Sequence, residues 1–195
     1  MKRSRLVEAW KDNFEHAPTV ITDFGGNVGD ITVKLAEAFP DAELYSYEPV
    51  PDNYAVLTER TAKYSNVKCI NKGVADKEGT ALIGISHDRE DSNTGLFSIL
   101  HPDGQNSQEI ELVDIETLTE RPELVKMDVE GLEYLLFKSG PKYFSNTKLI
   151  FYEHLPAGHA NYHEDLEKIP ELLKSWGFEA YDEIKNHNIT YVRFS

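Results

Sequence analysis

The sequence has 195 residues and a formal net charge of −14, from 20 lysines and arginines against 34 acidic residues. Its length is typical of one domain covering residues 1–195, and the acid excess argues against nucleic acid as a partner, because nucleic acid is bound mainly through lysine and arginine. No apolar run is long enough for a membrane span or a signal peptide, and the single Cys69 excludes an internal disulfide, so we expect a soluble, cytoplasmic protein with no membrane partner.

The N-terminal half alternates strand-like apolar runs with helical patterns. Residues 1–17 are expected to form a helical extension, and a first strand is expected over 20–24. Further along this half, helices are expected over 31–39 and 53–64, and strands over 43–48, 67–74 and 81–86.

Residues 87–108 are polar and have no sustained hydrophobic period. A loop of about this length in a compact domain is usually functional or disordered. We therefore treat 87–108 as a candidate substrate lid, and the alternative is a plain surface loop. The remaining strands are expected over 110–115, 124–129, 148–153, 178–181 and 189–194, with helices over 131–139 and around Pro170.

This alternation predicts an α/β fold, in which a mostly parallel sheet has helices on both faces. The last two strands are close in sequence, so they are expected to pair antiparallel at the C-terminal edge. Ligands of such sheets bind beyond the carboxyl ends of the strands. The residues that directly follow each strand are therefore the candidates for a functional site.

The first strand is followed by a glycine loop, residues 25–29, with the spacing acid-x-G-x-x-x-G from Asp23 to Gly29. Glycines let backbone amides approach a ligand closely, and the helix that follows directs its positive dipole end there. The simpler interpretation is a strand-to-helix turn with Asn27 as the N-cap.

Asp23 favours a particular kind of ligand. A carboxylate beside this loop would repel a pyrophosphate and attract an ammonium group. S-adenosylmethionine carries an ammonium, a carboxylate and a positive sulfonium, so it suits the loop better than a dinucleotide does. The glycine spacing also departs from G-x-G-x-x-G, which disfavours a nicotinamide-dependent oxidoreductase.

Glu48 ends the second strand, 19 residues after Gly29. An acid at this place can accept hydrogen bonds from both hydroxyls of a ribose. The alternative is an exposed carboxylate stabilised by a nearby helix N-terminus. The glycine loop upstream favours the ribose role.

Acidic residues also gather after two later strands. Asp128 and Glu130 alternate on an extended backbone and can project toward one side. The simpler interpretation of Glu130 and Glu133 is favourable placement of acids in the first turn of a helix, and it accounts fully for Glu133. Glu153 and His154 end the most apolar strand and can take a proton or bind a metal, although a local hydrogen-bonded pair explains them equally well.

With these motifs in view, the chain resembles the FkbM-type family of S-adenosylmethionine-dependent methyltransferases of class I. The resemblance covers roughly residues 18–156 and rests on five segments, VITDFGGNVGDITVKLA, YSYEPVPDNYAVL, NKGVADKEGTALI, LVKMDVEGLEYLLFKSG and LIFYEHLP. It implies a Rossmann-like, seven-stranded sheet with an antiparallel last strand. It also implies methyl transfer, often to a hydroxyl of a small-molecule or sugar-like acceptor.

The resemblance also implies roles for individual residues. To the methionine part of the cofactor it assigns Asp23, Gly25, Gly26, Asn27 and Gly29, where Gly26 replaces the alanine that is common in the family. To the ribose and nucleoside it assigns Glu48, Pro49 and Asn53, and to the adenine Asn71, Gly73, Val74 and Ala75. To the substrate side of the cleft it assigns Asp128, which also borders the cofactor, with Glu130, Glu153 and His154.

A methyl transfer to a weakly acidic hydroxyl needs a base. Our hypothesis is that Asp128 or His154 takes the proton, while Glu130 and Glu153 position the acceptor or a divalent metal. The alternatives are a non-catalytic protein that retains the fold, and an N- or nucleic-acid methyltransferase. The sequence identifies neither the acceptor, nor a metal ligand set, nor the oligomeric state.

Overall fold

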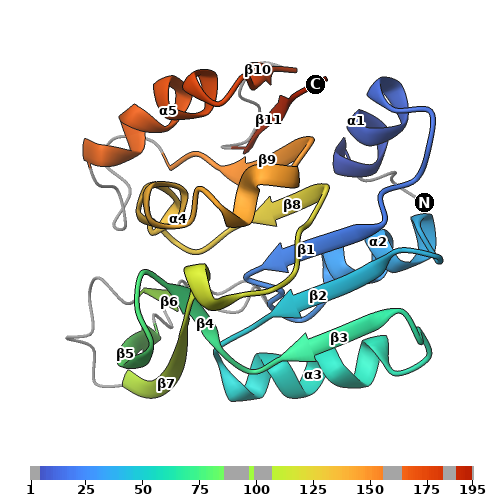
Figure 1. Cartoon of the computed structure of the whole chain (residues 1–195). Coiled ribbons are helices and arrows are strands. Elements are labelled where there is room, and N and C mark those ends of the chain that lie inside the picture. The colour runs from blue at the N-terminus through green and yellow to red at the C-terminus, as the bar shows by residue number, and fades with distance from the viewer. Residues whose placement is uncertain (1–4, 86–96, 99–106, 156–163, 182–187, 195) are drawn as a thin grey trace.

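The computed structural model describes residues 5–85, 97–98, 107–155, 164–181 and 188–194. Its centre is a seven-stranded sheet with the strand order β10-β11-β9-β8-β1-β2-β3 (Figure 1). The strands of this sheet are β1 Val20–Phe24, β2 Glu43–Tyr47, β3 Val67–Ile70, β8 Leu124–Met127, β9 Leu149–Glu153, β10 Glu179–Ala180 and β11 Asn188–Val192.

The pairing within this sheet confirms the predicted mostly parallel arrangement. Strands β3, β2, β1, β8 and β9 pair parallel to one another in this order, and β11 pairs antiparallel to both β9 and β10. The arrowheads of β1, β2, β3 and β8 accordingly point the same way in Figure 1. Their carboxyl ends form one edge, where the fold predicts the ligand.

Helices cover both faces of the large sheet, as expected. Side chains alternate along β1, so Ile21 packs in the cluster that contains Leu35, whereas Phe24 packs in the cluster that contains Phe137. The first face carries α1 Arg5–Asn13 and α2 Asp30–Ala38, and the second carries α4 Glu133–Ser139 and α5 Ile169–Ser175. Helix α3 Pro51–Thr61 packs on α2 and β3. None of the described helices combines the length and apolar character that a membrane crossing requires.

A second sheet was not predicted. It has the order β4-β7-β5-β6 and lies toward the carboxyl ends of β2 and β3 (Figure 1). Its strands are β4 Gly73–Ala75, β5 Gly79–Ile85, β6 Phe97–Ser98 and β7 Ser107–Asp114. The single strand expected over 67–74 is therefore wrong, because it divides into β3 and β4. Asn71 lies at the break, where its side-chain nitrogen donates to the backbone oxygens of Glu48 (2.8 Å) and Pro49 (3.1 Å).

The expected loop over 87–108 is wrong at its described positions. Residues 97–98 form β6, which pairs with β5, and β7 already begins at Ser107. The rest of that segment lies outside the described residues. In the predicted N-terminal extension, α1 buries Leu6 and Trp10 against the large sheet.

Candidate active site

A cavity of about 680 Å³, including its open mouth, lies at the carboxyl ends of β1, β2 and β8. Its walls come from the glycine loop, from residues 47–50, from β4 and β5, and from the turn after β8. Nine of the residues assigned from the sequence line it, namely Gly25, Asn27, Glu48, Pro49, Asn53, Gly73, Val74, Asp128 and Glu130.

The glycine loop passes directly over the end of β8. Gly25 has a φ of +78°, and a Cβ atom there would lie 1.9 Å from the backbone oxygen of Asp128, so only glycine fits. The backbone nitrogens of Gly25 and Gly26 donate to the backbone oxygen of Tyr47 at 3.0 and 2.8 Å. The N-cap of α2 is Gly29, which corrects the interpretation of Asn27 as the cap.

Glu48 is buried, which overturns the alternative of an exposed carboxylate. Its two carboxylate oxygens accept hydrogen bonds from the backbone nitrogens of Asn27 (2.7 Å) and Val50 (2.9 Å). Burial raises the pKa of the Glu48 carboxyl, and these two hydrogen bonds partly offset that rise. Each oxygen retains a second lone pair, so the carboxylate can accept further hydrogen bonds from a ligand in the cavity.

Asn53 supplies a buried donor beside this carboxylate. The residue is 5% exposed, and its side chain lies close enough to the Glu48 carboxylate to lower the pKa of that group. An amide nitrogen carries two N–H groups, so Asn53 can also donate to a polar ligand in the cavity.

Asp23 does not line the cavity, which corrects its expected role next to a ligand ammonium group. It is fully buried, and its Oδ1 atom lies 3.2 Å from the Nζ atom of Lys126. Its Oδ2 atom accepts a hydrogen bond of 2.6 Å from the hydroxyl of Thr32. The charge of Asp23 is therefore balanced by a cation of the protein itself.

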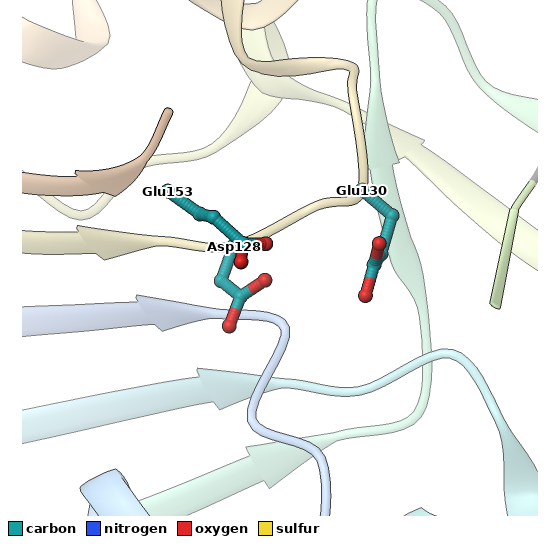
Figure 2. A group of neighbouring side chains, drawn as sticks. All are labelled: Asp128, Glu130 and Glu153. Carbon is teal, nitrogen blue, oxygen red and sulfur yellow. The ribbon is translucent and has the colours of Figure 1, made fainter. Parts of the chain in front are cut away.

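Three carboxylates form an acidic cluster at the edge of the cavity, namely those of Asp128, Glu130 and Glu153 (Figure 2). Asp128 and Glu153 come from the ends of the adjacent strands β8 and β9, and Glu130 comes from the turn after β8. One oxygen of each lies within 4.8 Å of the others, so the cluster has the donor set for a divalent cation.

The turn that carries Glu130 has an unusual backbone. Glu130 has a φ of +55° and Gly131 a φ of +102°. The fully buried Glu133 holds this turn, because its carboxylate accepts from the backbone nitrogens of Val129 (3.0 Å) and Gly131 (3.1 Å). Glu133 therefore has a structural role, as its helical position indicated.

Two carboxyl groups here titrate far above their usual range. Burial, together with the negative charges of Asp128 and Glu130, raises the pKa of Glu153 to about 8. Burial also raises the pKa of Glu133 to about 8, with a smaller contribution from the same two charges. A carboxyl group that titrates near neutral pH is suited to general acid–base chemistry.

The remaining predicted residues lie outside the cavity wall, namely Gly26, Gly29, Asn71, Ala75, Glu153 and His154. The His154 ring packs edge-on against Tyr152, with their centroids 6.1 Å apart. The residue that sequence reasoning missed is Lys126, which contacts both Asp23 and Asp128. A charged residue inside the otherwise apolar strand β8 was the available signal.

Comparison with known proteins gives one family match. The family model described as "Methyltransferase FkbM domain" matches residues 23–180. No curated protein sequence matches the chain significantly.

Several solved structures share the fold at low sequence identity. Precorrin-6y C5,15-methyltransferase from Geobacter metallireducens GS-15 is 11% identical, with a TM-score of 0.54 over 96% of this chain and 85% of its own. The N-methyltransferase NodS from Bradyrhizobium japonicum WM9 is 10% identical, with a TM-score of 0.54 over 98% and 95%. The fibrillarin pre-rRNA processing protein from Methanococcus jannaschii is 15% identical, with a TM-score of 0.56 over 97% and 74%. These likenesses concern the fold and do not identify an acceptor.

Proposed function

The chain belongs to the FkbM methyltransferase family, and from this premise we propose that it methylates a hydroxyl group of a small-molecule or sugar-like acceptor. Use of S-adenosylmethionine follows from the family. The proposal for the acceptor rests on one observation above all. The cavity that contains the buried carboxylate of Glu48 also contains Asp128 and Glu130.

The cofactor half of the cavity fits a nucleoside with an amino acid tail. Glu48 has lone pairs for two ribose hydroxyls, and the Asn53 amide beside it can donate to the ligand. Gly25 and Asn27 bring the glycine loop to the wall of the cavity, beside Glu48. S-adenosylmethionine supplies the methyl group as an electrophilic sulfonium.

The acceptor half of the cavity supplies a base. Asp128 lines the cavity and takes the proton from the acceptor hydroxyl. Glu153 lies beside Asp128 and holds a proton up to about pH 8, so the charge state of Glu153 sets the electrostatic environment of the base. Glu130 lies at the same edge and positions the acceptor.

We propose that Asp128 acts as the base without a bound metal ion. The acidic cluster has suitable oxygens, but the ammonium group of Lys126 lies 3.4 Å from Asp128 Oδ2. A fixed cation at that distance repels a divalent ion. Turnover that is lost in chelator and restored by a divalent cation would establish the metal scheme instead.

A turnover assay tests the acceptor class. The protein is incubated with S-adenosylmethionine and separate panels of hydroxylated small molecules, amines and RNA, and release of S-adenosylhomocysteine is measured. We expect turnover with a hydroxylated small molecule. Turnover confined to amines or RNA would contradict the proposed acceptor, and cofactor binding without turnover on any panel would favour the non-catalytic alternative.

A further inference from the structure

The ammonium group of Lys126 is buried where the glycine loop passes over the end of β8. Lys126 lies within β8 and is 4% exposed. Its Nζ atom donates to the backbone oxygens of Gly25 (2.6 Å) and Phe24 (3.3 Å). The same atom lies 3.2 Å from Asp23 Oδ1 and 3.4 Å from Asp128 Oδ2.

These four oxygens come from two separate parts of the chain. An ammonium group has three N–H donors, so it is shared among the backbone of the glycine loop, Asp23 and Asp128. The register of β1 and β8 places Lys126 opposite Asp23, which lets its side chain reach across to the start of the loop. The loop after β1 is therefore fastened to the end of β8 by one cation.

Stability alone does not explain this arrangement. A buried ion pair is often no more stabilising than a pair of well-packed apolar residues of similar volume. Here the shortest contact of the cation is with the backbone oxygen of Gly25, whose conformation sets the course of the loop along the cavity. A role in positioning the loop accounts for that contact.

We propose that Lys126 is a positioning residue for cofactor binding, which holds the glycine loop in its binding conformation by fixing the Gly25 carbonyl against the end of β8. This inference rests on the proposed function, because it concerns affinity for S-adenosylmethionine. It assigns no contact between Lys126 and the cofactor itself.

The test removes the cation without leaving a buried charge alone. The double variant Asp23→Asn/Lys126→Met eliminates both charges, and the amide oxygen introduced by Asp23→Asn can still accept from Thr32. The matched control is Glu123→Gln/Lys148→Met, because Lys148 forms an ion pair of 2.7 Å with the buried Glu123 at the opposite end of the large sheet. Thermal unfolding and circular dichroism establish that each variant is folded, and calorimetric titration gives the dissociation constant for S-adenosylmethionine.

We expect the double variant to bind S-adenosylmethionine about tenfold more weakly or worse, which corresponds to one lost charge-assisted hydrogen bond. The Glu123→Gln/Lys148→Met control should bind as the wild type does. Equal affinity in the wild type and the folded double variant would overturn the inference and leave the proposed function intact. Absence of binding by the wild type would overturn the proposed function, and the inference with it.

A measurement on the wild type covers the case in which the double variant does not fold. Amide hydrogen exchange of the ligand-free protein reports whether the backbone of residues 25–29 is ordered before the cofactor binds. The inference predicts protection of these amides comparable to that of β1. Exchange at the rate of an unstructured peptide would overturn it.

Discussion

The backbone nitrogen of Asn27 donates a 2.7 Å hydrogen bond to Glu48 Oε2, which joins the glycine loop to the end of β2. One carboxylate therefore shapes the loop and faces the cavity at the same time. The contact links the two sequence signals that first indicated a nucleoside ligand. Loss of this carboxylate should affect both the loop and the ligand.

We predict that Glu48→Ala weakens S-adenosylmethionine binding by about tenfold to a hundredfold, because hydrogen bonds to a charged group contribute about 1.5–3 kcal/mol. Calorimetric titration measures the change. Glu43→Gln is the control, since Glu43 lies at the other end of β2 and is exposed, with Tyr45 and Lys68 as its partners. A Glu48→Ala protein that binds as tightly as the Glu43→Gln control would rule out the ribose role.

Gly25→Ala should abolish cofactor binding and lower thermal stability. The new Cβ atom would lie 1.9 Å from the backbone oxygen of Asp128 at a φ of +78°. Gly177→Ala is a matched control, because Gly177 has a φ of +83° and the nearest atom to its Cβ would be Arg193 Cδ at 3.7 Å. The Gly177→Ala control should lose only the stability that a left-handed backbone conformation costs an alanine, about 1–2 kcal/mol. Equal losses of stability in the two variants, measured by thermal unfolding, would be inconsistent with the close approach.

Glu133 should make the protein less stable as pH rises from about 5 to 8. Its pKa is about 8 in the folded state, whereas the ordinary value is 4.5, so in this range the folded protein binds a proton that the unfolded chain lacks. The free energy of unfolding then falls with pH, by at most about 1.4 kcal/mol per pH unit for one group.

Urea unfolding at several pH values measures this slope for the wild type, for Glu133→Gln and for Glu171→Gln. Glu171 is an exposed acid on α5, so its variant should keep the wild-type slope. We expect a flatter slope for Glu133→Gln. An unchanged slope in that variant would mean that Glu133 is ionised throughout the range.

Methyl transfer should speed up as pH rises through about 8. Glu153 has a pKa of about 8, so above this pH it is ionised, and its negative charge beside Asp128 makes Asp128 a stronger base. Glu153→Gln should remove this limb of the pH profile, and Asp128→Asn should lower turnover by about a hundredfold or more. Wild-type turnover by Asp128→Asn would exclude its role as the base, and an unaltered profile in Glu153→Gln would exclude this effect of Glu153.

The sequence predicted those parts of the site whose signals are local. The glycines of the loop, and Glu48 at the end of a strand, indicate their roles within a few residues of their own positions. Asp128 was identified for the same reason, because it follows an apolar strand directly. In the structure Gly25, Glu48 and Asp128 line one cavity.

The features that were missed depend on partners far away in the sequence. Asp23 was expected to face a ligand, but the register of β1 and β8 gives it Lys126 as its counter-ion. The second sheet begins where Asn71 bonds to the backbone after β2. Asn71 and Gly73 disfavour a continuous strand, but only this bond across the fold shows where the new sheet starts. Both the counter-ion of Asp23 and the start of the second sheet are therefore set by contacts between residues far apart in the sequence.

Binding of S-adenosylmethionine to the wild-type protein tests the central claim most directly. A ligand at about a hundred times its dissociation constant should raise the free energy of unfolding by about 2.7 kcal/mol. We predict a clear rise in melting temperature with S-adenosylmethionine and with S-adenosylhomocysteine, and none with NAD. A protein that NAD stabilises, or that S-adenosylmethionine leaves unchanged, would contradict this account.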